Sequence, residues 1–307
     1  MSMTVYFAKL NLVSDDLFKL YTKEKSLSDI SNGLYLAVNA NKNWKKESVF
    51  YDDGGEPHYS TIEYSLRILR VDSSYSNIEG WLYKKSDLYY NIQNEKTKVL
   101  ERHSTENTEA IRFTLSVTHG FVAYNTTTRF GYKEFIEAFV SIVNLGEDAC
   151  KLDYRYNISL CNSGIGLDDI KNELKHIGKI KELRIKMQPP NPSEDLLADL
   201  QQRSDGIVKE FKAANVTEME LFYSTKGTTG INIDAPFINE KISDIQGLYS
   251  TLPVEESTKK GYVTVNAVSV EGKKYSSGDS KPLRIIVESV DGFFEACIAG
   301  FRTFFQR

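Results

Sequence analysis

The chain has 307 residues, of which 41% are hydrophobic and 26% are charged, and its net charge is −4. This length allows two ordinary domains with cores of their own, and the composition is that of a folded protein rather than a disordered one. The first residues lack the basic and apolar regions of a signal peptide, and no window approaches the roughly 20 apolar residues of a membrane-spanning helix, so we expect a cytoplasmic protein with no direct membrane insertion.

The first 146 residues are predicted to form a mostly antiparallel β domain with helices. Apolar residues alternate over 4–12, which predicts a strand. Ser14 is placed to cap a short helix, and a second helix is predicted over 26–39. His119 and Gly120 predict a two-residue hairpin turn. Further short strands are predicted over 59–71, 78–83, 98–101, 111–117 and 121–124.

Residues 132–143 form the clearest predicted helix, because Phe135, Phe139 and Val143 lie on one apolar stripe. The segment 144–148 is expected to end this helix. It is also the expected boundary between an N-terminal domain, 1–146, and a C-terminal domain, 147–307.

The second half is predicted to alternate strands and helices. Strands are predicted over 152–160, 181–187, 219–223, 262–270 and 283–287, and helices over 167–176, 193–214 and 290–305. The fold class is therefore α+β: an antiparallel-sheet N-terminal domain followed by an α+β C-terminal domain with a closing apolar helix.

The closing helix carries phenylalanines on nearly all its sides, so its apolar band needs cover from more than one direction. Phe301 and Phe305 are examples. That cover can come from the core of the same chain or from a second copy, and a homodimer through this helix is one prediction.

Metal and catalytic patterns are absent from the sequence. Cys150, Cys161 and Cys297 are widely spaced and include no Cys-x-x-Cys pair. The four histidines, His58, His103, His119 and His176, are isolated from one another and from the cysteines. We expect no metal, no cofactor and no catalytic residue.

Two glycine segments have some features of nucleotide-binding loops. Gly164 and Gly166 precede a predicted helix, but Asp168 and Asp169 follow and would repel a phosphate. The segment 226–230 has suitable residue types, but a strand follows it instead of a helix. Nucleotide hydrolysis is therefore disfavoured.

Two segments that contain acidic residues have some features of metal or nuclease sites. Glu182, Arg184 and Lys186 share one face of a predicted strand, as in some metal-dependent nucleases, and a solvated sheet face explains them equally well. The acidic segment 52–56 is expected to form an ordinary turn.

The loop 125–131 lies between a strand and the N-terminus of the clearest helix. Hydroxyl groups, the Arg129 guanidinium and free backbone amides could hold a phosphate there. The alternative is that Thr128 caps the helix and Arg129 is merely exposed.

Basic residues gather in two segments of the second half. Residues 171–186 contain six cations against two carboxylates, and residues 258–284 contain the same numbers. Such clusters suit a phosphate backbone, although solvated faces give the same pattern. With Arg129 and Lys226, the candidate DNA-binding residues are Lys171, Lys175, Lys179, Lys181, Arg184, Lys186, Lys259, Lys260, Lys273 and Lys274.

The order of elements resembles that of a group of prophage and phage-defence proteins. The likeness lies in the phrase 121–125, in Gly131, Tyr132 and Lys133 opening an apolar helix, in the strand 183–186 and in the apolar C-terminal helix. The group includes lambda RexA, an abortive-infection DNA sensor, and it is similar to the KwaB component of Kiwa defence. The resemblance implies a dimeric DNA-binding protein of bacterial antiviral defence without catalysis of its own, and a membrane-protein effector as a partner.

Three functions follow as hypotheses. The first is a non-enzymatic, homodimeric sensor or effector that binds the DNA backbone without sequence preference, as the basic segments and the resemblance imply. The second is a metal-dependent nuclease that uses Glu182. The third is a structural, protein-binding component of a defence complex, whose basic segments contact an acidic partner.

Overall fold

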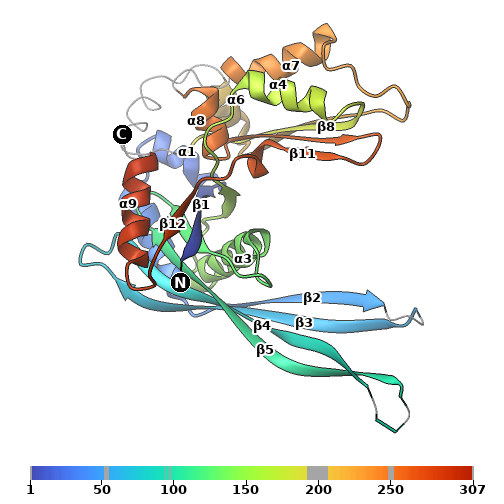
Figure 1. Ribbon diagram of the computed structural model, residues 1–307. Helices are drawn as coiled ribbons and strands as arrows, with labels where there is room; N and C mark the ends of the chain where they lie inside the picture. The colour runs from blue at the N-terminus through green and yellow to red at the C-terminus, as the bar shows by residue number, and fades with distance from the viewer. Residues whose placement is uncertain are drawn as a thin grey trace.

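The computed structural model describes residues 2–51, 55–93, 95–96, 98–191, 207–247 and 252–305. It has an α+β fold, as the sequence predicts, and its strands form two separate antiparallel sheets (Figure 1). The elements of the first half are β1 (Met3–Leu12), α1 (Asp16–Tyr21), α2 (Leu27–Val38), β2 (Asn43–Tyr51), β3 (Pro57–Val71), β4 (Asn77–Gln93), β5 (Leu100–Ser116), β6 (Phe121–Asn125) and α3 (Tyr132–Cys150).

The second half of the chain has shorter strands and more helices. Its elements are β7 (Tyr156–Leu160), α4 (Leu167–His176), β8 (Ile180–Met187), α6 (Ile207–Ala214), β9 (Met219–Ser224), α7 (Pro236–Gly247), α8 (Val254–Lys259), β10 (Val263–Ser269), β11 (Lys274–Ser276), the 3-10 turn η1 (Ser277–Asp279), β12 (Arg284–Val287) and α9 (Phe293–Phe305).

The first sheet has the strand order β12-β1-β6-β5-β4-β3-β2, and β7 also pairs with β1. Strand β1 carries apolar side chains on both faces, so other elements must pack on both faces. Phe7 contacts Phe301 and Phe304 of α9 on one face. On the other face, Phe139 of α3 packs edge to face on Phe113 of β5, with ring centroids 5.1 Å apart.

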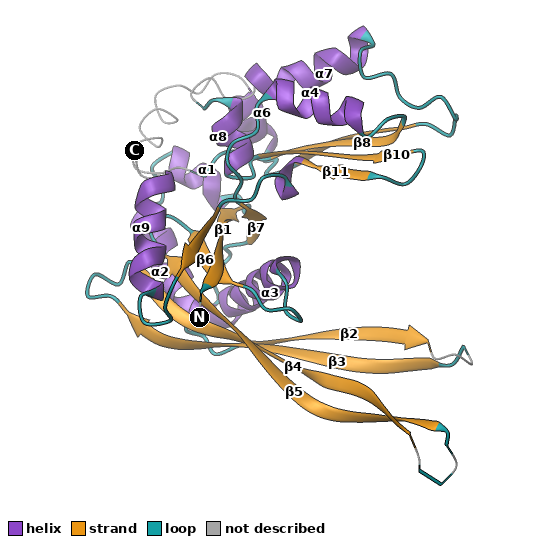
Figure 2. Cartoon of the chain, viewed as in Figure 1, coloured by secondary structure: helices purple, strands orange, loops and turns teal. Residues whose placement is uncertain are grey.

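The second sheet has the order β11-β10-β8-β9, and the helices of the described residues cover one of its faces. Leu183 and Ile185 of β8 are fully buried against that face, in one core with residues of α4, α6 and α7. The alternate residues of β8, such as Arg184, point to the open face. In Figure 2 this open face is directed toward α3 and the long strands of the first sheet.

Two strands from the second half of the chain belong to the first sheet. Tyr156–Leu160 and Arg284–Val287 were expected in the C-terminal domain, but both pair with β1 along the edge that β6 leaves open. The physical reason is that β1 is a long central strand whose backbone N–H and C=O groups need hydrogen-bond partners along both edges. The expected division at residue 146 therefore falls inside α3, and the second half returns to the first sheet at both of its ends.

The predicted end of the clearest helix is wrong. Helix α3 continues through 144–148 and ends at Lys151, which has φ of 56°. Gly146 lies in the helix because α2 crosses there: a Cβ at Gly146 would overlap the carbonyl oxygen of Ala37. The glycine thus serves helix packing and not helix termination.

Two smaller predictions about caps and turns also need correction. The N-cap of α1 is Asp15 and not Ser14, and Asp16 in the first turn is held by Lys19 and Lys25. The β5–β6 hairpin is confirmed, but its loop has four residues, because Ser116 pairs with Phe121. By contrast, the helix predicted over 26–39 is confirmed as α2, and Ser26 caps it with a full capping box.

The strand predicted over 59–71 is confirmed as β3, whereas the short strands predicted over 78–83, 98–101 and 111–117 belong to the much longer β4 and β5. Strands β4 and β5 each have 17 residues and stay paired from Asn77↔Ser116 to Gln93↔Leu100. Beyond residue 85 the ribbon is mostly solvent-exposed on both faces, so it has no buried face to impose alternation. The acidic turn at 52–54 and the start of the helix predicted at 193 lie outside the described residues.

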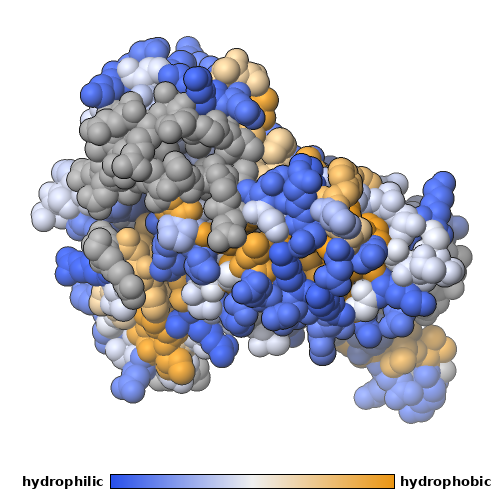
Figure 3. Space-filling view, turned by 90° about the horizontal axis from the view of Figure 1, so that it is seen from above, coloured by the Kyte–Doolittle hydropathy of each residue, from blue (hydrophilic) through white to orange (hydrophobic). Residues whose placement is uncertain are grey.

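One face of the molecule is largely hydrophilic where its residues are described. Figure 3 shows hydrophilic residues over most of the face seen from above, with hydrophobic residues in separated groups. None of the helices in the described part of the chain is long and apolar enough to cross a membrane.

A basic tip and a polar pocket on the second sheet

Three connections meet at one end of the second sheet: the turn from α4 to β8, the loop from β9 to α7 and the turn from β10 to β11. The amide of Val270 donates to the Lys179 carbonyl at 2.7 Å, and the amide of Thr225 donates to the Lys181 carbonyl at 3.0 Å. These bonds bring together residues that are up to about 95 positions apart in the sequence. We call this end the basic tip; its cations are Lys179, Lys181, Lys226, Lys273 and Lys274.

The basic tip is only partly neutralised. Lys273 forms an ion pair with Glu271 at 3.2 Å. The side chains of Lys179, Lys181, Lys226 and Lys274 are exposed, and no carboxylate of the described residues lies within 4.0 Å of their ammonium groups. Four ammonium groups without acidic partners therefore share one end of one sheet.

The other cations of the first basic segment have partners. Lys175 pairs with Asp234 at 3.0 Å, and Lys171 donates to the Ser243 hydroxyl. On the open face of β8, Arg184 lies 3.5 Å from Glu220 of β9, and Lys186 lies 2.6 Å from Glu218, which precedes β9. Glu182, the residue of the nuclease hypothesis, lies 4.0 Å from Arg184.

Lys259 and Lys260 of the second basic segment are also separated from the tip. Both ammonium groups contact Glu256, at 3.2 and 3.3 Å. Lys259 also donates to the Phe304 carbonyl at the end of α9, where a cation suits the negative end of the helix. Lys259 therefore connects α8 with α9, and the predicted segment 258–284 does not form one surface.

The loop 125–131 is organised by its own side chains. The Thr127 hydroxyl accepts from the Phe130 amide and donates to Glu109. The N-cap of α3 is Gly131, so Thr128 does not cap the helix. Glu134 occupies the first turn, where a phosphate would have to bind, and it pairs with Lys84 at 2.9 Å. Arg129 is exposed, and its carbonyl accepts from Lys84.

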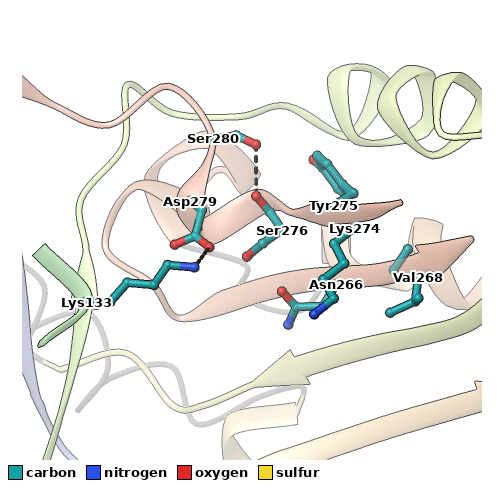
Figure 4. Close-up of a pocket in the computed structure, with 9 residues that line it drawn as sticks. Lys133, Asn266, Val268, Lys274, Tyr275, Ser276, Asp279 and Ser280 are labelled. Atoms are coloured by element: carbon teal, nitrogen blue, oxygen red, sulfur yellow. Dashed lines mark hydrogen bonds and ion pairs between the residues drawn. The ribbon is translucent and has the colours of Figure 1, made fainter. Parts of the chain in front are cut away.

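A polar pocket lies beside the basic tip, between the start of α3 and the open face of the second sheet. Its volume is about 420 Å³. Figure 4 shows Lys133 of α3 reaching Asp279 of η1, at 2.8 Å, while Asn266 and Lys274 project from β10 and β11. Lys274 thus belongs both to the pocket and to the basic tip. The pocket offers two ammonium groups and an amide, with one carboxylate already paired.

The sequence did not identify Lys133, Asp279 or Asn266. Asn266 could have been found, because the alternation of β10 turns Thr264, Asn266 and Val268 to the face opposite its buried residues. The pair of Lys133 with Asp279 joins residues 146 positions apart, and nothing local in the sequence signals it.

The glycine segments weighed as nucleotide loops have local roles. Gly166 is the N-cap of α4, and the Glu255 carboxylate lies beside it, 2.9 Å from where a Cβ would stand. Gly230 has φ of 81° and packs against the backbone of Lys179, which closes the loop of the basic tip. The Glu255 carboxylate beside Gly166 would repel a nucleotide phosphate. The close backbone packing at Gly230 leaves no open loop there to surround one.

Cysteines and histidines do not gather. Burial raises the pKa of the Cys161 and Cys297 thiols to about 12, so both stay protonated. In the described ranges, no three residues of the types His, Cys, Asp and Glu are placed to hold one metal ion.

Comparison with known proteins gives one match. A family model described as "Domain of unknown function (DUF4747)" matches residues 73–292, which is more than two thirds of the chain. No curated protein and no solved structure matches the sequence or the fold. The matched region includes β4 to β12, and with them both the basic tip and the pocket.

Proposed function

The chain belongs to the DUF4747 family, and we propose that it is a non-enzymatic DNA-binding protein that contacts the phosphate backbone through the basic tip. The observation that carries this proposal is the convergence of Lys179, Lys181, Lys226 and Lys274 at one end of the second sheet without acidic partners. Phosphate contacts position a protein on DNA but carry no base information, so binding is expected to be independent of sequence.

The net charge of −4 limits where DNA can bind. Elsewhere on the open face, Arg184 and Lys186 already have glutamate partners, and breaking those pairs would offset the gain from phosphate. The pocket beside Lys274 extends the tip with Asn266, whose amide can donate hydrogen bonds to phosphate oxygens or to a base edge. The proposed path of the backbone therefore runs from the tip to the pocket.

The salt dependence of binding tests this proposal. Each phosphate that a lysine neutralises adds about 0.9 to the slope of log K against log salt, so four lysines contribute a slope of about −3.6. We expect Lys179→Gln, Lys181→Gln, Lys226→Gln and Lys274→Gln together to weaken binding to a 30-base-pair duplex and to flatten the slope by about that amount. Fluorescence anisotropy at several salt concentrations measures both quantities.

The matched control changes four exposed lysines elsewhere: Lys42, Lys45, Lys209 and Lys212, each to Gln. It removes the same charge from the whole protein, so it corrects for long-range electrostatics. Equal slopes for the two variants, or no binding by the unchanged protein, would reject the basic tip as a DNA-binding surface. Incubation with plasmid and Mg²⁺ tests the nuclease alternative, and we expect intact plasmid.

We further propose that the protein acts in the cytoplasm in bacterial antiviral defence, as its resemblance to abortive-infection proteins implies. The plating efficiency of phage on cells that express the protein tests this role. We expect protection by the unchanged chain and by the control variant, and loss of protection by the tip variant. Protection that survives loss of DNA binding would separate the defence role from the basic tip.

A further inference from the structure

Strand β4 has a free edge along its outer half. The β3–β4 ladder ends at the pair Glu63↔Lys85, whereas β4 and β5 remain paired as far as Gln93↔Leu100. Within the described residues, 86–93 of β4 therefore have a strand partner on one side only. Figure 2 shows the β4–β5 ribbon separating from the β2–β3 hairpin beyond this point.

This edge lacks the usual protection. Free edges are normally blocked by charged side chains or proline, because their unpaired amides and carbonyls accept any additional strand. Residues 86–93 contain a single charged residue, Asp87. The other free edge of the same ribbon, on β5, contains Glu101, Arg102 and Glu106 within the same length. The outer edge β2 contains Lys45 and Lys46.

The side chains of the segment are also suited to a partner. Tyr90 is 43% exposed and Ile92 is 46% exposed, and both lie on the face that Leu88 shares. A two-stranded ribbon is only marginally stable in water when nothing covers its apolar face. The ribbon thus combines a strand edge with no second ladder partner among the described strands, low charge and exposed apolar side chains.

We infer that residues 87–93 of β4 pair with the same residues of a second copy of this chain, antiparallel and across a two-fold axis. Such an axis is perpendicular to the sheet, so each face of one ribbon continues into the same face of the other. With Tyr90 at the axis, Leu88 lies opposite Ile92 of the second copy, which makes one apolar cluster of the two ribbons. Asp87 lies opposite Gln93 of the second copy, so no like charges face each other.

The low charge of this edge is what selects a second copy as its partner. When a strand pairs with the same strand of a second copy, each charged residue lies opposite a residue of the same segment. The β5 edge has three charged residues, so this pairing would bring like charges close together. The β4 edge has only Asp87, which the two-fold arrangement keeps away from its counterpart. The inference does not depend on DNA binding, and its tests contain no DNA.

A cysteine scan reads out the two-fold axis directly. Opposite residues of an antiparallel pair have Cβ atoms about 4.5–5.5 Å apart, close to the separation that a disulfide needs. In a Cys150→Ser background, Tyr90→Cys is expected to form a disulfide-linked dimer on mild oxidation. Ile92→Cys is the matched control: its counterpart lies four residues along the pair, about 13 Å away, and should not link.

Light scattering over a concentration series gives the second readout. We expect a dimer for the unchanged protein, and we expect Tyr90→Lys with Ile92→Lys to raise its dissociation constant by at least about 100-fold, because like charges then meet at the axis. Ser104→Lys with Thr105→Lys adds the same charge to β5 and should leave the dimer intact. A monomer at all concentrations, or a dimer that neither links at position 90 nor responds to the β4 lysines, overturns the inference.

Discussion

Glu79 of β4 and Arg112 of β5 form an ion pair of 2.6 Å on adjacent strands, beneath α9. The glutamate is almost completely buried and also contacts Arg70 at 2.8 Å. Arg112 in turn donates to the Val290 carbonyl at 2.5 Å, just before α9 begins. One buried carboxylate thus connects three strands of the first sheet with the start of the closing helix.

We therefore predict that Glu79→Ala destabilises the protein by about 3–5 kcal/mol, because removal of one member of a buried pair leaves the other without a partner. Glu106→Ala removes a carboxylate from an exposed pair with Lys85 and should cost less than about 1 kcal/mol. Urea denaturation of the two variants makes the comparison. Similar losses in both would mean that Glu79 contributes no more than a surface charge.

The second prediction concerns Glu147, which is buried in α3. Neither of its carboxylate oxygens has a hydrogen-bond partner among the described residues, and burial raises its pKa to about 7. In the unfolded chain the pKa returns to about 4.3. Between these values the folded state binds more protons, so the free energy of unfolding should fall as pH rises from about 4.5 to 7.

Glu147→Gln removes this titration. The variant should gain stability relative to the unchanged protein as pH rises through that window, with the full gain above pH 7. Urea unfolding at pH 5, 6, 7 and 8 gives the difference between the two proteins, in which the histidine titrations cancel. Glu137→Gln, on the exposed face of the same helix, is the control. A difference that does not vary with pH would contradict the assigned pKa.

The third prediction tests the helix crossing at Gly146. An exposed glycine in a helix usually gains stability when replaced by alanine, by up to about 1 kcal/mol. Here the added methyl group would overlap the Ala37 carbonyl of α2, and overpacking of this kind costs about 1–3 kcal/mol. We expect Gly146→Ala to lower the thermal midpoint, while Ser141→Ala on the same helix leaves it nearly unchanged. A higher midpoint for Gly146→Ala would mean that α2 moves away freely.

The success of sequence analysis followed the strength of local periodicity. Helix α4 begins and ends where predicted. The ends of β8 and β10 lie within one residue of their predicted positions, because one face of each strand is buried. The outer half of β4 has no buried face, so its length could not be read from alternation. The pairing of β7 and β12 with β1 is non-local, and only the folded chain reveals it.

The basic tip shows the same limit for the candidate site. Lys179 and Lys274 belong to different basic segments, and they meet because Ser269 pairs with Ile180 in an antiparallel register. The sequence contains both segments but not that register. It also could not show that Lys186, Lys259 and Lys260 have glutamate partners. The pairs of Lys259 and Lys260 depend on the turn of α8, and the pair of Lys186 depends on the β8–β9 ladder.

The last prediction concerns α9, which the sequence offered as a dimer contact. In the structure, Phe301 is 3% exposed and lies edge to face on Phe7, with the Phe121 ring 6.2 Å away. The helix is thus covered by its own chain, through β1 and β6. Phe301→Ala should therefore destabilise the protein by about 3–5 kcal/mol, the usual cost of removing a buried phenylalanine, without changing its oligomeric state. Urea unfolding and light scattering of the same sample measure the two effects separately, and Arg302→Ala, on the exposed side, should change neither. If Phe301→Ala kept its stability but no longer dimerised, the dimer contact would lie on α9 and not on β4.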